Sequence, residues 1–281
     1  FSGKMYNFTQ YGVDKETEML NYDSLAELAS AEKPKLILSG YTAYPRKIDF
    51  KRFRKICDEV GAVCMADIAH IAGLCVSGVH ENPAPYFDVV TTTTHKTLRG
   101  PRGAVIMSKK EHAEKVDKAV FPGLQGGPHE HIIAAKAVAF KEASTPAFRK
   151  YAEQIVKNAQ ALAKELSGHG LRLVSGGTDN HLMLVDVTKL GLTGKQAENS
   201  LEKAAVYCNK NTIPFDTRSP FDPSGIRIGT PVLTTRGMKE KHMKEVGEFI
   251  FLALKNSSGE KELSKIKKKV KSFCAQFPFY A

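Results

Sequence analysis

The sequence has no apolar run of about 18 residues or more, so no segment is predicted to cross a membrane. It also lacks a secretory n-region and h-region at its start, which leaves export without support. Its cysteines are odd in number and widely spaced, and they form no CxxC pair or Cys/His cluster: Cys57, Cys64, Cys75, Cys208 and Cys274. Neither a disulfide framework nor a metal site is therefore predicted, and a reducing cytoplasmic location is favoured.

The composition is that of an ordinary globular protein. With 42% hydrophobic and 25% charged residues, the 281-residue chain is neither a disordered, a collagen-like nor a coiled-coil sequence. Its length fits one large domain or two of ordinary size. The chain begins with Phe1 rather than methionine, which indicates a processed product or a fragment.

The positive charge is concentrated near the C-terminus. The net charge is +11, and residues 255–281 contain seven lysines against two glutamates. Nucleic-acid binding at this segment would rest on charge alone. Because Ile266, Val270 and Phe273 recur at helical spacing, we expect instead an amphipathic terminal helix with a solvated lysine face.

The first half of the chain alternates between strand and helix patterns. A helical pattern begins at Asp49 and ends near Gly61. Apolar, partly β-branched runs predict strands at residues 35–39, 62–67, 87–93 and 103–107. Such strands, separated by helices, predict an α/β domain with a largely parallel sheet that is covered on both faces.

The second half predicts a smaller α+β domain. Thr193 and Gln196 form a capping-box pattern that begins a helix. Strands are expected at residues 171–175, 181–187 and 225–229, and helices at 147–167, 238–255 and 260–275. This change in pattern places a boundary near residues 144–146, which predicts one domain over residues 1–145 and another over 146–281.

Reactive side chains follow the strands of the first domain. Residues 39–42, then Asp67 and His70, then His95 and Lys96 come after three successive predicted strands. Ligands of open parallel sheets bind beyond the carboxyl ends of the strands, which is where these residues are expected. A lysine and an aspartate at neighbouring strand ends suit pyridoxal phosphate, because the lysine can bind its aldehyde and the aspartate can pair with its ring nitrogen. A solvated lysine and a helix-capping aspartate remain the alternatives.

Two further features point to an amino-acid substrate. The Gly/Pro-rich residues 121–128 precede a helix expected near His131, where free backbone N–H groups could bind a phosphate, although such clusters are also ordinary turns. Arg227 lies between Ile226 and Ile228 and suits either a substrate carboxylate or a structural ion pair.

Several segments resemble serine hydroxymethyltransferases of bacterial type. Residues 89–103, with four threonines before His95-Lys96, are similar to the pyridoxal-lysine signature of that family. Residues 66–74 resemble its aspartate segment. Further matches are residues 121–128, 175–181, 219–221 and 224–231. The resemblance covers essentially the whole chain and implies a pyridoxal-phosphate fold type I (aspartate aminotransferase-like) large domain, incomplete at its N-terminus, plus the smaller domain.

The resemblance implies the cofactor residues position by position. Lys96 would bind pyridoxal 5'-phosphate covalently, and Asp67 would pair with the ring nitrogen. His70 and Thr42 would lie near the phenolic oxygen; the family usually has serine at the position of Thr42. His95 completes the expected catalytic set. The remaining cofactor-binding residues are Thr93, Gly126 and Gly127, the two glycines meeting the phosphate of a cofactor bound mainly by the other subunit.

The resemblance also implies substrates and partners. Arg227 would bind the carboxylate of the amino acid, and the residues expected against tetrahydrofolate are Asn211, Ser219, Pro220 and Phe221. A homodimer in the cytoplasm is implied, with no membrane, nucleic acid or metal. The family extends well before Phe1, and its main phosphate loop, ring-stacking histidine and acid–base glutamate have no match here. We therefore expect a C-terminal portion with little activity alone.

The implied parent reaction converts serine and tetrahydrofolate to glycine and 5,10-methylenetetrahydrofolate. One alternative is a folate-independent pyridoxal-phosphate aldolase or aminotransferase. Another is a non-enzymatic remnant that acts as a binding module. Dependence of the reaction on tetrahydrofolate distinguishes the family reaction from that of a folate-independent enzyme. The absorbance of bound cofactor distinguishes either enzyme from a non-enzymatic binding module.

Overall fold

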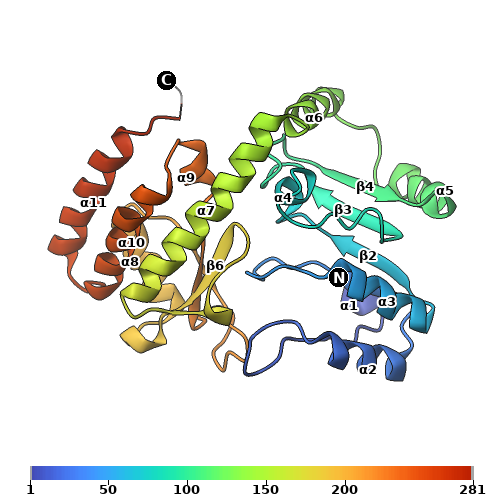
Figure 1. Cartoon of the computed structure of the whole chain (residues 1–281), viewed down its shortest axis with the longest axis horizontal. Helices are drawn as coiled ribbons and strands as arrows, with labels where there is room; N and C mark the ends of the chain where they lie inside the picture. The colour runs from blue at the N-terminus through green and yellow to red at the C-terminus, as the bar shows by residue number, and fades with distance from the viewer. Residues whose placement is uncertain (1, 280–281) are drawn as a thin grey trace. The chain divides into compact units, whose positions relative to one another are not determined.

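Helices and strands alternate along the chain, which a computed structural model describes over residues 2–279 (Figure 1). The chain divides into two units. Unit 1 comprises Phe1–Thr42 and Ile48–Ser144, and unit 2 comprises Ala43–Lys47 and Thr145–Ala281. Each unit has its own four-stranded sheet, and the two are described separately.

The sheet of unit 1 is mixed. Its strands lie in the order β1 (Leu36–Ser39), β2 (Val63–Asp67), β3 (Val89–Thr93) and β4 (Ala104–Ser108). The first three are parallel, as predicted, whereas β4 runs antiparallel to β3. The ten residues between β3 and β4 are too few for the crossover, about a dozen residues or more, that a parallel neighbour requires.

One face of this sheet is covered by helix α3 (Phe50–Val60). Asp49 caps this helix by accepting from Arg52 N–H, and Gly61 ends it in the left-handed conformation. The helix is strongly amphipathic and buries Phe50 and Phe53. Phe50 packs edge-on against Phe87 at 5.3 Å between ring centroids.

The expectation that both faces are covered was wrong for the described residues. Leu36 and Leu38 alternate with buried Ile37 along β1, yet they are 44% and 39% exposed. Ile106 on β4 is 45% exposed. These three side chains lie on one apolar sheet face that no other described element of unit 1 buries.

The other helices of unit 1 are α1 (Ser2–Met5), α2 (Tyr22–Glu32), α4 (Ala72–Val76), α5 (Lys110–Lys118) and α6 (Glu130–Ala143). A π-type turn covers Ala119–Leu124 between α5 and α6. Helix α6 confirms the helix expected near His131. Helices α2 and α5 were missed because α2 buries only Leu25 and Ala29 and α5 buries no residue.

The sheet of unit 2 is antiparallel. Its order is β5 (Arg172–Leu173), β6 (Leu182–Asp186), β8 (Gly225–Gly229) and β7 (Asn209–Asn211). The strand predicted over residues 171–175 is shorter than expected. Ser175 and Gly176 take φ values of 55° and 74° in a 3-10 turn, which are incompatible with an extended strand.

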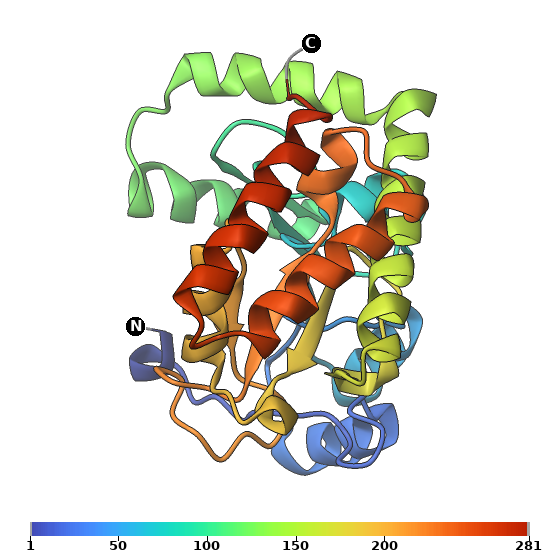
Figure 2. The ribbon, with the colours of Figure 1, turned by 90° about the vertical axis from the view of Figure 1, so that its left-hand side faces the viewer.

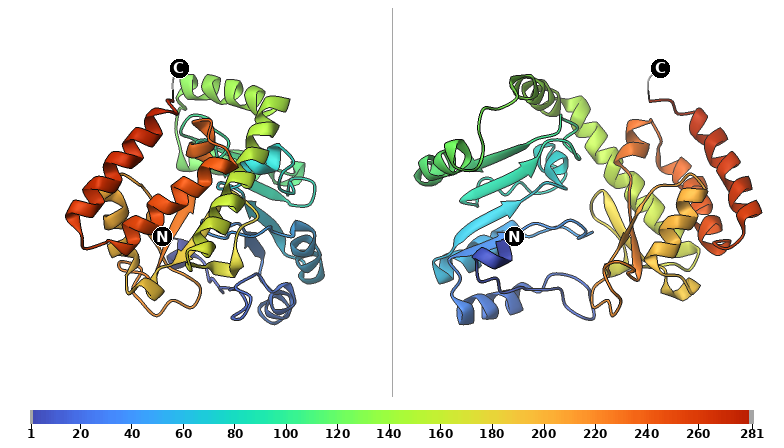
Figure 3. Two further views of the ribbon diagram at one scale, coloured as in Figure 1. Left: turned by 60° about the vertical axis from the view of Figure 1, so that its left-hand side comes forward. Right: turned by 180° about the vertical axis from the view of Figure 1, so that it is seen from behind.

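Helices cover one face of this sheet: α7 (Pro146–Gly168), α8 (Gly194–Lys203), α9 (Pro231–Thr235), α10 (Glu240–Lys255) and α11 (Glu260–Ala275). Figure 3 shows α8, α10 and α11 on the same side of the strands. Thr145 caps α7, with Pro146 at its first position. The capping box of Thr193 and Gln196 is confirmed at α8.

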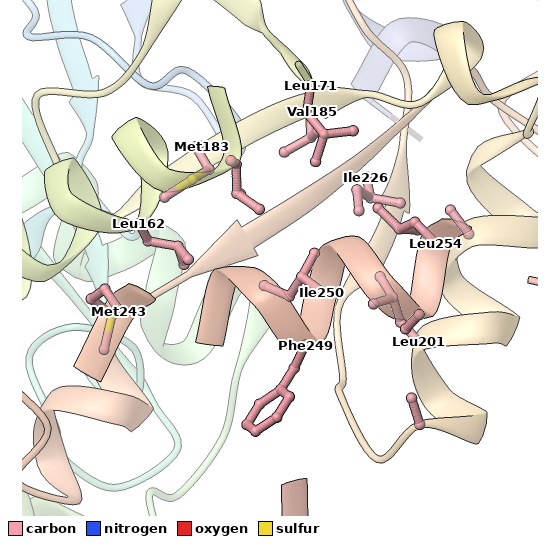
Figure 4. Close-up of a cluster of buried hydrophobic side chains, with 14 of the residues drawn as sticks. Leu162, Leu171, Met183, Val185, Leu201, Ile226, Met243, Phe249, Ile250 and Leu254 are labelled. Atoms are coloured by element: carbon pink, nitrogen blue, oxygen red, sulfur yellow. The ribbon is translucent and has the colours of Figure 1, made fainter. Parts of the chain in front are cut away.

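The core of unit 2 lies between the sheet and these helices. In Figure 4, Ile226 of β8 meets Ile250 and Leu254 of α10, and all three are at most 2% exposed. Alternate residues of β6 face the same core, including Met183 and Val185. Burying each such side chain stabilises the fold by about 1.5–3 kcal/mol.

The predicted terminal helix is confirmed. Figure 2 shows α11 lying beside α10. Its buried stripe includes Ile266, Val270 and Phe273, while its lysines are exposed. None of the helices within residues 2–279 combines the length and apolar character that crossing a membrane requires.

Candidate active site

Asp67 and Lys96 follow neighbouring strands of unit 1. Asp67 is the last residue of β2, and Lys96 lies three residues beyond the end of β3. The two strands are parallel, with Asp67 in register with Thr91, so both side chains belong to the same sheet edge. Asp67 Oδ1 accepts from Ala69 N–H at 2.9 Å. Both side chains are exposed, and Lys96 Nζ has no ion-pair partner among residues 2–279.

The loops that follow β1, β2 and β3 pack closely together. Gly40 has φ +121°, and a Cβ there would lie 1.9 Å from the carbonyl oxygen of Asp67. Thr97 Oγ1 accepts from Gly73 N–H at 3.0 Å and donates to the carbonyl oxygen of His70 at 2.9 Å. Only a residue without a side chain fits at position 40, so backbone contacts hold the three loops at one edge.

Thr42, His70 and Thr93 lie on the same three loops. Thr42 is exposed and follows β1, whereas His70 is partly buried after β2. Thr93 ends β3, and its hydroxyl lies 3.5 Å from the carbonyl oxygen of Ala69. The sheet edge thus carries hydroxyls and an imidazole near the loops of Asp67 and Lys96.

Among the described residues, only one of the two ring nitrogens of His95 is hydrogen-bonded. Its Nε2 lies 3.3 Å from Arg102 Nη1. A guanidinium only donates, so Nε2 accepts and Nδ1 carries the proton. Nδ1 is buried without a hydrogen-bond partner among residues 2–279. A buried donor of this kind costs free energy unless a bound polar group or water accepts from it.

One wide hollow of about 940 Å³ contains the glycine loop. Its lining includes His95, Arg102, Gly126, Gly127 and Lys136. The glycines precede α6, whose first N–H groups lack helical partners. The structure therefore brings His95 and the two glycines to one hollow, whereas Asp67 and Lys96 do not line it.

The remaining candidates lie in unit 2. Arg227 is partly buried on β8, and its Nη2 donates to Asn209 Oδ1 at 3.1 Å. Burial lowers the pKa of Arg227 from its ordinary value. Asn211 ends β7 and donates from Nδ2 to the carbonyl oxygen of Thr212 at 2.7 Å.

Ser219, Pro220 and Phe221 are exposed on the loop between β7 and β8. Phe221 is 85% exposed. Asp216 organises this loop, since it accepts from the N–H and the hydroxyl of Ser224 at 2.9 and 2.7 Å. Burial opposes ionisation of Asp216, but these hydrogen bonds outweigh it and lower its pKa. An exposed ring on a fixed loop offers a flat surface for a planar ligand.

The residues of unit 1 fit pyridoxal phosphate. Lys96 supplies a primary amine, Asp67 a carboxylate whose Oδ2 does not accept from Ala69, and His95 a buried donor without an acceptor among residues 2–279. The amine and the carboxylate match what the aldehyde and the ring nitrogen of that cofactor require.

A family model described as serine hydroxymethyltransferase matches residues 1–250. The chain belongs to the serine hydroxymethyltransferase family. This family consists of pyridoxal-phosphate-dependent transferases of fold type I that use tetrahydrofolate and act on serine and glycine. The resemblance identified from the sequence is thereby confirmed.

Some residues of the candidate site were missed by sequence reasoning. Arg102 lies within the lysine signature but received no role, although a cation seven residues from a histidine was visible there. Asn209 alternates with Asn211, which places both on one face of a strand. Asp216 had no sequence signal, because its partners are set by the conformation of the loop.

Asp88, Glu111 and His112 form the one described group that could hold a metal ion, with ligand atoms within 4.8 Å of one another. The Asp88 carboxylate is already bound by Arg54 Nη1 at 2.9 Å and Lys109 Nζ at 2.6 Å. Two cations at the same carboxylate oppose metal binding, so this group is accounted for as an ion-pair network.

Proposed function

We propose that the protein transfers a one-carbon unit between serine and tetrahydrofolate, which yields glycine and 5,10-methylenetetrahydrofolate. The observation that carries this proposal is the placement of Asp67 and Lys96 after neighbouring parallel strands, in a chain of the serine hydroxymethyltransferase family. The roles given below to single residues belong to the proposal.

Lys96 would bind pyridoxal phosphate covalently through Nζ, and Asp67 would pair with its ring nitrogen. When bound, this cofactor withdraws electrons from the bonds at the Cα atom of the amino acid. His70 and Thr42 would hydrogen-bond the phenolic oxygen, and Thr93 would lie against the cofactor on the same edge.

Gly126 and Gly127 would bind the cofactor phosphate through their backbone N–H groups. A Cβ at either glycine would meet no atom within 4 Å, so the space beside the loop is open on that side. The start of α6 adds the positive end of a helix dipole. As the resemblance implies, this phosphate would belong to a cofactor held mainly by a second subunit.

Arg227 would bind the substrate carboxylate through its guanidinium, which offers a planar pair of donors. His95 would keep its proton on Nδ1, because Nε2 accepts a hydrogen bond from Arg102. It would then donate from Nδ1 to a polar group of the bound ligands. Each of these residues binds or orients, and the site needs no metal for these roles.

Asn211, Ser219, Pro220 and Phe221 would contact tetrahydrofolate. The exposed ring of Phe221 supports this assignment, since the pterin is flat and aromatic. A homodimer and a cytoplasmic location remain predictions from the resemblance.

The test is the absorbance of pyridoxal phosphate mixed with the purified protein. Wild-type protein should give a near-visible band that Lys96→Ala abolishes, while Lys118→Ala, which removes an exposed lysine paired with Glu114, should keep it. A band that survives Lys96→Ala contradicts the assignment. Serine cleavage at full rate without tetrahydrofolate would favour a folate-independent enzyme, and a protein that binds no cofactor would favour a binding module.

A further inference from the structure

The hydroxyl of Tyr11 bridges the two ends of the turn that follows β1. It donates to the carbonyl oxygen of Leu38 at 2.6 Å and lies 2.7 Å from the hydroxyl of Tyr41. A carbonyl oxygen only accepts, so the single proton of Tyr11 lies towards Leu38, and Tyr41 is the donor in the second hydrogen bond. One oxygen atom therefore ties residue 38 to residue 41 across Gly40.

Tyr11 is itself fixed by the core of unit 1. Its ring meets that of Tyr41 edge-on, with the ring centroids 6.3 Å apart, and that of Phe53 with the centroids 6.0 Å apart. Phe53 lies on α3 and is fully buried. Burial raises the pKa of Tyr11 to about 12, although the hydrogen bond from Tyr41 acts in the opposite direction. The hydroxyl therefore keeps its proton, and the bridge to the turn, at neutral pH.

The turn that Tyr11 bridges supports the backbone of Asp67. Ser39 and Ala66 are the last Cα partners of β1 and β2, so the ladder ends before Gly40 and Asp67. Gly40, at φ +121°, packs so closely that a Cβ there would lie 1.9 Å from the carbonyl oxygen and 3.1 Å from the Cα atom of Asp67. On its other side Asp67 pairs with β3. The position of this aspartate on the β1 side therefore depends on the turn.

We propose that Tyr11 is a positioning residue for Asp67: its hydroxyl holds the turn at Gly40, and the turn holds the carboxylate where the ring nitrogen of pyridoxal phosphate binds. This inference rests on the proposed role of Asp67 in cofactor binding. Tyr11 acts through the backbone of the turn and not on the cofactor directly. Its loss should therefore affect a cofactor that pairs with the aspartate and spare one that cannot.

The experiment compares pyridoxal phosphate with 1-deazapyridoxal phosphate, in which a C–H group replaces the ring nitrogen, by equilibrium dialysis against the purified, cofactor-free protein. Both compounds keep the aldehyde, the phenolic oxygen and the phosphate, but only the first can pair with Asp67. Tyr11→Phe removes the bridging hydroxyl and keeps the ring. It should raise the Kd for pyridoxal phosphate about three- to tenfold, the range for one weakened hydrogen bond, and leave that for the deaza compound unchanged.

Tyr22→Phe is the matched control. The ring of Tyr22 also packs on Phe53, with the centroids 5.5 Å apart, but its hydroxyl accepts from the N–H of Asp49 at the start of α3. This variant therefore loses a hydroxyl next to the same core residue without touching the turn at Gly40. It should keep the wild-type Kd for both compounds.

A second readout needs no cofactor. Ala69 N–H donates to Asp67 Oδ1 at 2.9 Å, so the exchange of this amide with solvent reports how firmly the carboxylate is held. Exchange at Ala69 should be faster in Tyr11→Phe than in wild type or Tyr22→Phe. An unchanged rate in Tyr11→Phe would mean that the turn does not hold the aspartate, which overturns the proposal.

The outcomes of the binding experiment separate the two proposals. A wild-type protein that binds neither compound, or both equally, contradicts the proposed function, and the role of Tyr11 with it. If wild type prefers pyridoxal phosphate and Tyr11→Phe keeps that Kd, the role of Tyr11 alone is overturned. An equal rise of both Kd values would mean a general structural effect, which also overturns it. If Tyr11→Phe fails to fold, Tyr41→Phe removes the other hydroxyl of the bridge, and an unchanged Kd for pyridoxal phosphate in that variant refutes the proposal.

Discussion

Arg54 Nη1 donates to Asp88 Oδ2 at 2.9 Å and so joins helix α3 to the residue that precedes β3. The same carboxylate accepts from the N–H of Cys64 on β2 at 2.7 Å and from Lys109 Nζ at 2.6 Å. Asp88 is 7% exposed. One buried carboxylate therefore connects α3, β2 and the segment between β4 and α5, next to the sheet that carries Asp67.

We expect this network to make unit 1 sensitive to acid. Burial opposes ionisation of Asp88, but hydrogen bonds from Cys64, Lys109 and Arg54 outweigh it and lower its pKa from 3.8 to about 2. The folded pKa is the lower one, so the stabilisation, about 2 kcal/mol, is present above pH 4 or so and is lost as the pH falls towards about 2. Urea unfolding between neutral and acid pH measures this loss.

Asp88→Asn should remove this part of the pH dependence and destabilise the protein at neutral pH by about 3 kcal/mol or more, because Arg54 loses a buried partner. Asp58→Asn is the control, since Asp58 also pairs with Arg54 but is exposed. It should cost at most about 1 kcal/mol. Equal effects of the two variants would contradict the central role of Asp88.

Gly40→Ala should destabilise the protein by about 2–4 kcal/mol, because the new Cβ would overlap the carbonyl oxygen of Asp67 at a φ that L-residues rarely adopt. Thermal unfolding checks this. Gly12→Ala, where a Cβ would meet no atom within 4 Å, should change stability by no more than about 0.5 kcal/mol. A stable Gly40→Ala variant would mean that the loops after β1 and β2 are not in contact.

Arg227→Ala should raise the KM for serine about ten- to a hundredfold while pyridoxal phosphate stays bound, since a hydrogen bond to a charged group is worth about 1.5–3 kcal/mol. Steady-state kinetics and cofactor absorbance measure the two quantities. The control Arg149→Ala removes an exposed arginine paired with Glu153 on α7. Unchanged serine binding in Arg227→Ala would leave Arg227 with a structural role only.

Phe221→Ala should raise the KM for tetrahydrofolate about three- to tenfold and leave glycine binding unchanged, because an aromatic contact contributes about 0.5–1.5 kcal/mol beyond its buried area. Tyr207→Ala is the control, since Tyr207 is 80% exposed but lies outside the loop of Phe221. A change in glycine binding without a change in folate binding would refute the assignment.

Much of the secondary structure could be predicted from the sequence. Apolar runs predicted β1, β2, β3 and β8, and amphipathic spacing predicted α3, α7, α10 and α11. These patterns are local, so the residues that specify an element also form it. Helices α2 and α5 escaped prediction because a helix that buries few residues needs no strong apolar stripe.

The order of strands and motifs along the chain determined that Asp67 and Lys96 follow neighbouring strands, and it identified the family; their roles stay predictions. Only the tertiary structure decided the direction of β4, the uncovered sheet face, and the partners of Asp88, His95 and Arg227. These features depend on register and on contacts between distant segments. Asn209 meets Arg227 because β7 pairs with β8 in one register, and nothing within either segment specifies that register.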